Sequence, residues 1–372
     1  MALVVVMSAF NGLDDLLKSL YKTFDADLLI TPAEGKVFLP TTAEFTAIRE
    51  MKGVYAFSKV LEENVLLRYR GHQEIATMKG VDSVFEASTA IHEAIYDGEF
   101  KLHHGELEQA VLGLALAQKL QIGLYFIDPL DVYLPRRTGT VSLLRPEESL
   151  MRERTFPSGI FEIEKSYDSQ YIFVPIDFAR RLLEYTDEVS AVEIQVQAGV
   201  EIEKMQKSIE KILGAEYKVR TRYQQNESMY KMMAAEKMVV YFIMLFIIVI
   251  ISCNIVGSLT MLIIEKKEDT ETLQSLGADR KLINRIFLLE GWMISLLGII
   301  VGLILGLTLC FAQQYFGIIR MSGDFLVSHY PVTIVWKDIV LAVLSVALIG
   351  FVAAWLPLYF INKPFRPRSR KS

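Results

Sequence analysis

The sequence has little cysteine and little histidine, with two and five residues respectively among 372. Cys253 and Cys310 both lie inside long apolar runs, where cysteine usually packs as a small hydrophobic residue. They therefore do not read as the two halves of a disulfide bond. His103 and His104 are adjacent, but consecutive side chains point apart and no third ligand stands at a useful spacing. We therefore expect a solvated histidine pair and no metal site.

Motifs that bind nucleotides or support hydrolysis are also absent from the sequence. It contains no phosphate-binding loop of the form GxxxxGK[ST], no strand followed by GxGxxG and no HExxH helix. We therefore expect no catalytic residues and no cofactor in this chain. Any energy source must come from another subunit.

Basic side chains are scarce in the first two thirds of the chain. Residues 1–237 carry 27 basic and 36 acidic side chains, whereas residues 238–372 carry 12 basic and 8 acidic ones. Nucleic acid is bound through a basic face, so the acidic first part argues against a nucleic-acid partner.

Long apolar runs are what the sequence has in excess, since 52% of its residues are hydrophobic. Residues 238–264 and 339–361 contain no charged side chain, and residues 286–312 contain only Glu290. At about 1.5 Å per residue, each run extends roughly 35 to 40 Å as a helix and exceeds the ~30 Å hydrocarbon core of a bilayer. The sequence thus predicts three complete transmembrane helices and excludes a purely soluble enzyme.

The loops between these runs differ in basic charge, which predicts their side of the membrane. Residues 265–285 and the tail 362–372 each hold five Lys or Arg residues, whereas residues 313–338 hold only two. By the positive-inside rule the two basic segments are cytoplasmic and residues 313–338 lie outside. The large part of the chain before residue 238 is therefore predicted to lie in the periplasm, in a multi-pass protein of the inner (plasma) membrane.

The first twelve residues are apolar but too few to span a bilayer. They have neither the basic start nor the small-residue cleavage site of a signal peptide. We expect residues 1–12 to be the remnant of a first transmembrane helix whose earlier half is missing. A peripheral apolar N-terminus is the alternative.

The predicted fold is an α-helical membrane protein with three complete transmembrane helices, a partial N-terminal one and a large α+β extracytoplasmic domain. The predicted segments are the helix remnant 1–12, the periplasmic α+β domain with amphipathic stalk helices 13–237, transmembrane helix 238–264, cytoplasmic coupling loop 265–285, transmembrane helix 286–312, periplasmic loop 313–338, transmembrane helix 339–361 and basic cytoplasmic tail 362–372.

Apolar spacing within residues 13–237 predicts helices and strands in mixed order. The expected helices are 13–24, 42–51, 110–120, 176–185, 202–213 and 223–237. The expected strands are 27–31, 54–60, 64–69, 74–80, 124–127, 131–134, 160–163, 171–175 and 191–196. The polar stretch 135–156 is expected to protrude as a loop. Neither Gly nor Pro separates 223–237 from the first complete span, so the two can form one continuous rod.

The cytoplasmic loop contains a segment that is expected to form a short helix. Residues 268–276 can be helical, with Gly277 at the C-terminal stop and Leu273 and Leu276 on one face. Such a helix could dock in a groove of a cytoplasmic partner or could simply connect two spans in solvent, and the residues alone leave both readings open.

Small and polar residues within the apolar runs are candidates for helix packing. Gly291, Gly298, Gly302 and Gly306 fall on one helix face, where small residues let another helix approach closely. Asn254 lies near the middle of the first complete span and is expected to need a polar partner. Glu290 is expected to reach the membrane interface.

Several segments resemble a known family. Residues 254–266 (NIVGSLTMLIIEK), 273–278 (LQSLGA) and 286–291 (IFLLEG) are similar to the permease family of lipoprotein-releasing ABC transporters, in the group shared with macrolide-exporter and cell-division permeases. The outside part agrees through residues 114–120 (LALAQKL), 159–164 (GIFEIE), 167–169 (YDS) and 173–179 (FVPIDFA). Residues 2–12 (ALVVVMSAFNG) resemble the end of the first span of the family, and the similarity covers nearly the whole chain.

The resemblance implies a four-helix permease subunit that extracts lipoproteins from the outer leaflet of the inner membrane and passes them to a periplasmic lipoprotein chaperone. The implied partners are cytoplasmic ABC ATPase subunits, which bind ATP and Mg, and a second permease copy or paralogue, together with lipoprotein substrates and membrane lipid. The loop 265–285 would dock on the ATPase, which makes Glu265, Lys266, Leu273, Leu276 and Gly277 the implied coupling residues.

In one paralogue of the family a hook recruits the chaperone. Residues 135–154 occupy the matching position here, so Arg145 and Pro146 are the implied chaperone-contact residues. Two alternatives remain open at this point. The chain could be a macrolide-exporter-like or cell-division-like mechanotransmission permease, or a non-transporting membrane-anchored receptor, which would lack the coupling loop.

Overall fold

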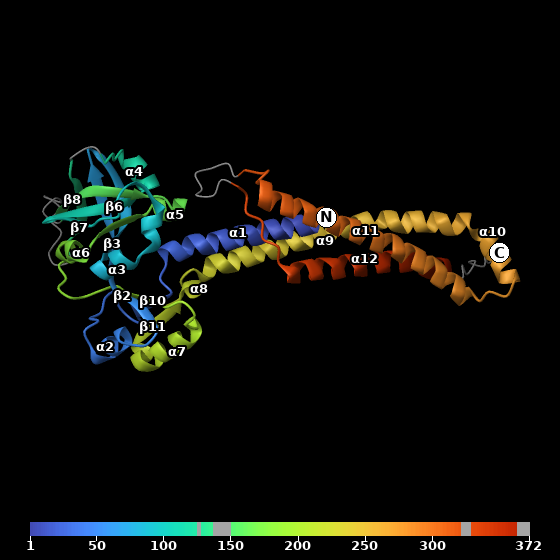
Figure 1. Cartoon of the computed structure of the whole chain (residues 1–372), viewed down its shortest axis with the longest axis horizontal. Helices are drawn as coiled ribbons and strands as arrows, with labels where there is room; N and C mark the ends of the chain where they lie inside the picture. Colours follow the sequence, from blue (N-terminus) through green and yellow to red (C-terminus); the bar gives the residue numbers. More distant parts are fainter. Residues whose placement is uncertain (125–127, 137–149, 321–328, 363–372) are drawn as a thin grey trace, which may run out of the picture. The chain divides into compact units, whose positions relative to one another are not determined.

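The computed structural model describes residues 1–124, 128–136, 150–320 and 329–362, with side chains described up to residue 359. These residues form two compact units (Figure 1). The membrane unit contains residues 1–16 and the described residues after 230, and the sheet unit contains the described residues from 17 to 230.

The sheet unit is built on one mixed sheet. Its strands are β1 (Leu28–Pro32), β2 (Val54–Tyr69), β3 (His72–Val81), β4 (Ile95–Gly98), β5 (His103–His104), β6 (Leu107–Gly113), β7 (Leu130–Pro135), β8 (Leu150–Phe161), β9 (Tyr171–Pro175), β10 (Ala191–Val196) and β11 (Tyr217–Thr221). Their order is β11-β1-β10-β2-β3-β9-β6-β8-β4, with β5 paired to β6 and β7 paired to both β2 and β8.

The long strand β2 gives this sheet its shape. Its first half pairs with β10, from Val54 to Val60, and its second half pairs with β7, from Leu66 to Arg68. Because β7 also pairs with β8, the strands β2, β3, β9, β6, β8 and β7 form a closed ring of pairings. Closure removes exposed strand edges.

Short helices cover the sheet and complete its core. They are α2 (Ala43–Arg49), α3 (Ser83–Ser88), α4 (Leu114–Leu120), α5 (Lys165–Asp168), α6 (Ile176–Leu183), α7 (Ile202–Leu213) and α8 (Arg222–Gln225), with 3₁₀ turns at Ala90–Ala94 and Gly214–Glu216. Helix α6 buries Ile176, Phe178, Ala179, Leu182 and Leu183 in the main core, as its apolar spacing requires. Gly113 precedes α4 where the backbone passes so close to Asp168 that a Cβ would lie 2.2 Å from its carbonyl oxygen.

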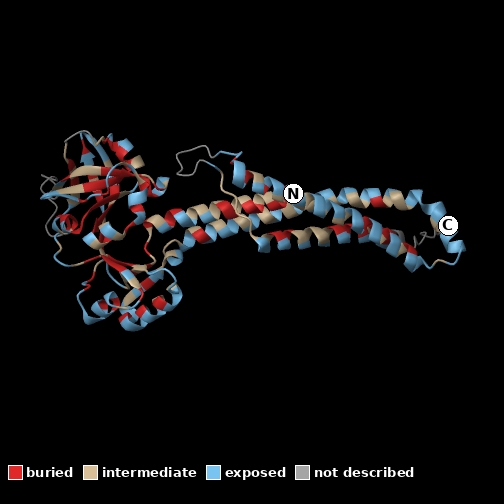
Figure 2. Ribbon diagram, in the orientation of Figure 1, coloured by how far each residue is buried: buried red, intermediate tan, exposed pale blue. Residues whose placement is uncertain are grey.

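The membrane unit is helical. It contains α9 (Glu227–Glu265), α10 (Lys267–Ser275), α11 (Arg280–Phe316), α12 (Trp336–Asn362) and the first residues of α1 (Ala2–Phe24). Three of these helices, α9, α11 and α12, are long and apolar enough to cross a membrane. Large apolar side chains stay exposed along them, such as Phe246 at 64% and Leu297 at 60%, whereas the buried residues of the sheet unit gather on its strands (Figure 2). Exposed apolar helix faces are typical of surfaces that meet lipid or another helix.

The predicted fold class is confirmed for its three apolar helices and its α+β domain. Residues 2–12 are helical as the start of α1, but their origin in a first membrane span stays a prediction. The strands 171–175 and 191–196 and the helix 202–213 form as predicted.

Several local predictions were wrong. Residues 110–113 belong to β6, because their apolar side chains are buried within the sheet, and only residues 114–120 form the expected helix. Residues 150–156 are part of β8 and not of a loop, since they pair with β7 from Leu150 to Thr155. The two strands expected at 54–60 and 64–69 are one strand, β2. The strand expected at 124–127 falls largely outside the described residues.

The stalk prediction needs a further correction. A turn at Asn226 separates α8 from α9, so the continuous helix begins at Glu227 and not at Tyr223. Beyond that turn α9 continues without interruption to Glu265, and the join between 227–237 and the apolar span is helical as predicted from its lack of Gly and Pro.

Candidate functional site

An apolar cavity of about 360 Å³ lies among the helices of the membrane unit. It is lined by residues of α1, α9, α11 and α12, among them Val4, Ile255, Leu303 and Val346. The hydroxyl groups in its lining come from Ser252 and Ser295. A cavity of this composition suits an apolar chain much better than a polar solute.

The four glycines of α11 meet different surroundings. A Cβ at Gly291 would lie 2.9 Å from the Cβ of Ala354, so α11 and α12 are in close contact there. Gly302 and Gly306 face Met1 at the start of α1. Gly298 lines the apolar cavity and has no atom within 4 Å of the position that a Cβ would take.

Two polar residues of the membrane helices are exposed. Asn254 lies on an exposed face of α9, and no hydrogen bond of its side chain is found within the described part of the chain. Glu290 is exposed on α11. The partner that Asn254 was expected to need is therefore not supplied by the described residues of this chain.

The five residues assigned to ATPase coupling lie around α10. Glu265 ends α9, and Lys266 precedes α10 with its Nζ atom 3.1 Å from Asp269 Oδ2. Leu273 and Leu276 are 45% and 81% exposed, which leaves their apolar surface available to a partner. Gly277 adopts φ +96°, a left-handed backbone that favours glycine, and so ends the helical segment.

The proposed chaperone-contact residues Arg145 and Pro146 lie outside the described residues. The strands on either side of them are described, with Pro135 of β7 opposite Leu150 of β8. On β8, Arg152 and Arg154 both bind Asp131 of β7, with Nη2 of Arg152 lying 2.7 Å from Asp131 Oδ2.

A polar cluster in the membrane unit joins α1, α9 and α12. The Lys237 ammonium group donates to Asn11 Oδ1 at 2.7 Å and to Asp338 Oδ2 at 2.8 Å. The Asn11 amide also donates to Asp338 Oδ2, at 2.8 Å. The three residues thus satisfy one another and set the register of three helices.

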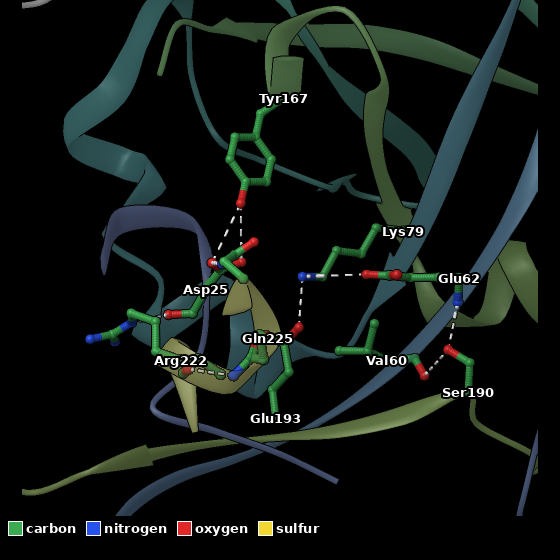
Figure 3. A network of polar contacts seen from close by, with 11 residues as sticks. Asp25, Val60, Glu62, Lys79, Tyr167, Ser190, Glu193, Arg222 and Gln225 are labelled. Atoms are coloured by element: carbon green, nitrogen blue, oxygen red, sulfur yellow. Dashed lines mark hydrogen bonds and ion pairs between the residues drawn. The ribbon is translucent and has the colours of Figure 1, made fainter. Parts of the chain in front are cut away.

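A second polar cluster lies in the sheet unit and is centred on Lys79 of β3 (Figure 3). Its Nζ atom is 2.6 Å from Glu193 Oε1 of β10 and 3.5 Å from Glu62 Oε1 of β2. The side chain of Lys79 is 3% exposed and that of Glu193 is 7% exposed. The ammonium group of Lys79 also lies 4.8 Å from the ring centre of Phe24, at the end of α1. A buried charge of this kind requires its partners, since an unpaired one would be costly.

Asp25 extends this cluster to the ends of α1 and α8. Its carboxylate accepts a hydrogen bond from the Tyr167 hydroxyl group at 3.4 Å (Figure 3). It accepts another from the side-chain amide of Asn226. Arg222 of α8 donates to the carbonyl oxygen of Asp25 at 3.1 Å and binds Asp27 Oδ1 at 2.9 Å. The last residues of α1 and the turn before α9 are therefore tied to each other and to the sheet.

Burial controls the ionisation of this cluster. Burial alone would lower the pKa of Lys79, but Glu193 and Glu62 raise it above its ordinary value, so the lysine stays charged. Burial raises the pKa of Asp25, and Lys79 partly opposes that shift. Burial also raises the pKa of Glu193, so Lys79 offsets only part of the cost of burying the carboxylates around it.

Sequence reasoning missed this second cluster. Lys79 stands in the buried second half of β3, between Met78 and Gly80, and Glu193 stands between the buried residues Val192 and Ile194, which was an available signal for a buried ion pair. Their pairing could not be inferred because it depends on the neighbours of β2 in the sheet.

The described residues hold no group of three or more His, Cys, Asp and Glu side chains that could bind a metal ion. His103 and His104 lie on the short strand β5, where both are exposed.

Comparison with known proteins defines the class of this chain. Residues 241–364 match the FtsX-like permease C-terminal family. The chain therefore carries an FtsX-like permease domain, and it is similar to ABC transporter permeases of the Lol type. The family resemblance drawn from the sequence is confirmed.

Its similarity to individual proteins is low but extends along much of the chain. It is 23% identical over 257 residues to the lipoprotein-releasing system transmembrane protein LolE of Haemophilus influenzae, which covers 66% of this chain and 60% of LolE. It is 23% identical over 318 residues to LolC of the same system in Buchnera aphidicola. This alignment covers 84% of this chain and 75% of LolC. The alignment with LolE thus spans less than two thirds of that relative.

A solved structure is similar to part of the chain. The structure of the periplasmic region of MacB from Actinobacillus actinomycetemcomitans aligns at 7% identity and a TM-score of 0.38. The alignment covers 58% of this chain and 98% of the MacB chain in that structure.

Proposed function

We propose that this chain is the permease subunit of a system that extracts lipoproteins from the outer leaflet of the inner membrane and hands them to a periplasmic chaperone. The observation that carries the proposal is the similarity of the chain to two lipoprotein-releasing proteins, and the apolar cavity of about 360 Å³ among α1, α9, α11 and α12 supports it. Each methylene of an acyl chain loses about 0.8 kcal/mol when it leaves the bilayer, so an apolar cavity lowers the cost of extraction.

The remaining free energy would come from a partner. In this proposal, cytoplasmic ABC ATPase subunits bind the exposed leucines Leu273 of α10 and Leu276, which directly follows that helix. The helices α1 and α9 then transmit the ATP-driven motion, because α9 is continuous from Glu227 to Glu265 and the polar clusters fix both helices. The sheet unit and the residues 137–149, which include Arg145 and Pro146, would face the chaperone on the periplasmic side. A second permease copy or paralogue would complete the complex.

The cavity can be tested by filling it. Gly298→Leu places a side chain into space that has no atom within 4 Å of the Cβ position, so the fold is expected to persist. We expect this variant to keep ATP hydrolysis in reconstituted membranes but to lose most lipoprotein release. Gly257→Leu is the matched control, because Gly257 is also a helical glycine with no atom within 4 Å and does not line the cavity. Equal release by the two variants would contradict the role of the cavity.

The proposed ATPase contact has its own test. Leu276→Asp is expected to abolish co-purification with the ATPase subunits, whereas Ser275→Asp, on a neighbouring and also exposed position, is expected to retain it. Depletion of the protein in cells should leave outer-membrane lipoproteins in the inner membrane. Normal lipoprotein sorting after depletion, with no paralogue present, would refute the proposed function as a whole.

A further inference from the structure

A second pocket of the membrane unit combines an apolar floor with a cationic rim. It has a volume of about 410 Å³ and lies where α9, α10, α11 and α12 meet. Its floor includes Ile283, Phe287 and Leu358, which are buried and form one apolar cluster. Its rim holds two cations and one carboxylate, Lys267, Arg280 and Glu271, so the lining changes from apolar to charged with a net positive charge.

The pocket lies at the boundary between apolar and charged sequence. The uncharged run 238–264 of α9 is followed by Glu265, Lys266 and Lys267. Arg280 stands at the start of α11, before the apolar run of that helix. A molecule bound here would therefore place its apolar part beside the membrane-crossing segments and its polar part beside the loop. This division of polarity is that of a phospholipid and not that of a soluble metabolite.

The two cations of the rim are available to an anion. Lys267 Nζ is 3.9 Å from Glu271 Oε1, and both side chains are largely exposed, so this contact is weak. No ion pair of Arg280 is found among the residues that the structure describes. The side-chain amides of Gln274 and Asn284 also line the pocket and supply further N–H donors.

We propose that this pocket binds an anionic phospholipid, with its phosphate between Lys267 and Arg280 and the start of its acyl chains against Ile283, Phe287 and Leu358. A guanidinium group pairs with phosphate through two parallel hydrogen bonds, and basic pockets between membrane helices on the cytoplasmic side suit anionic headgroups. Bound lipid would hold α10 against α9 and α11. This site is separate from the apolar cavity and does not depend on lipoprotein release.

The test compares two lipids on the purified full-length chain in a neutral detergent. Native mass spectrometry measures the binding of phosphatidylglycerol and of phosphatidylcholine, and we expect phosphatidylglycerol to bind at least fivefold more tightly. Lys267→Gln and Arg280→Gln are each expected to weaken its binding about fivefold, the effect of about one basic residue near an anionic lipid. Lys267→Arg is expected to retain the binding.

Matched controls separate the pocket from general surface charge. Lys281→Gln and Arg285→Gln remove exposed cations of the same helix, α11, that do not line the pocket, and we expect them to change binding by less than about twofold. All four residues are exposed, so the lipid-free unfolding temperature is expected to stay the same.

Three results would overturn the proposal. Equal binding of the two lipids, or equal losses in the pocket and control variants, would remove the specific site. Displacement of phosphatidylglycerol by millimolar inorganic phosphate would assign the rim to a free anion. An unchanged lipid preference in Lys267→Gln and Arg280→Gln, together with altered self-association or ATPase binding, would assign the pocket to a protein partner.

Discussion

The two units each hold α1 and α9 through a polar cluster, and these clusters differ in burial. In the sheet unit, Lys79 and Glu193 are almost completely buried, and the cluster reaches α1 through Asp25. In the membrane unit, the side chains of Lys237 and Asp338 are 34% and 19% exposed. When one residue of a buried ion pair is removed, the charge that remains has no alternative partner. A half-buried charge can instead be solvated by water. The comparison therefore indicates that the sheet-unit cluster is rigid and that the membrane-unit cluster tolerates change.

The largest effect should come from breaking the buried pair. Lys79→Met leaves Glu193 and Glu62 without their cation, and we expect it to lower the free energy of unfolding by about 3–5 kcal/mol. Denaturant unfolding of the full-length chain in detergent measures this change. Adding Glu193→Met is expected to recover part of the loss. Lys36→Met is the control, since Lys36 is 79% exposed in its pair with Glu63 and should change stability by less than about 1 kcal/mol.

Interrupting α9 between the two clusters should have the next largest effect. Ala235→Pro removes a backbone hydrogen bond and adds a steric clash, at a local cost of about 3 kcal/mol. We expect ATPase binding to persist and lipoprotein release to be lost in reconstituted membranes. Ala235→Ser, at the same exposed position, is the control. Release at the wild-type rate by the proline variant would show that a continuous α9 is not needed.

A smaller effect should appear as a pH dependence of the sheet unit. Burial raises the pKa of Asp168 to about 7, from about 4 in an unfolded chain. Between these values the folded state binds the proton more readily, so the free energy of unfolding falls as the pH rises from about 4 to about 7. Asp168→Asn keeps an oxygen for the Ile163 N–H group, which binds Asp168 Oδ1 at 2.9 Å, and should remove this slope.

Stability measured from pH 4.5 to 7.5 checks that expectation. Asp177→Asn serves as the control, since the side chain of Asp177 is 71% exposed. If wild type and Asp168→Asn showed the same slope, the buried carboxyl group would not be its source.

The smallest effect is expected at the membrane-unit cluster. Lys237→Met removes two hydrogen bonds of a half-buried group, and we expect a loss of about 1 kcal/mol in the free energy of unfolding. A double-mutant cycle with Asp338→Asn measures the coupling between the two side chains. A loss as large as that of Lys79→Met would contradict the difference between the clusters.

The elements with strong periodicity could be predicted from the sequence, whereas those that depend on neighbours could not. Helix 202–213 is amphipathic over its whole length, and strands 171–175 and 191–196 are short apolar runs, so local pattern was sufficient. Residues 110–113 looked helical because apolar residues continue directly into α4, and only their pairing with β8 and β9 makes them a strand. The turn at Asn226 has neither Gly nor Pro to mark it.

The candidate sites show the same division. The exposure of Leu273 and Leu276 beside a helix end at Gly277 follows from local spacing and backbone conformation. The apolar cavity and the Lys79 cluster combine residues that are more than one hundred positions apart, such as Val4 with Val346 and Lys79 with Glu193.

The sequence by itself determined that the chain has three apolar helices, since twenty or more uncharged apolar residues have few stable alternatives to a membrane-crossing helix. It also determined the order of charge along the loops and the match of residues 241–364 to the FtsX-like permease family. The tertiary structure alone decided that the strands close into a ring, that the apolar cavity forms among four helices, and that a lysine lies buried beside two carboxylates. The physical reason is that the apolarity of a segment is set by local sequence, whereas pairing partners and cavities depend on which distant segments pack together.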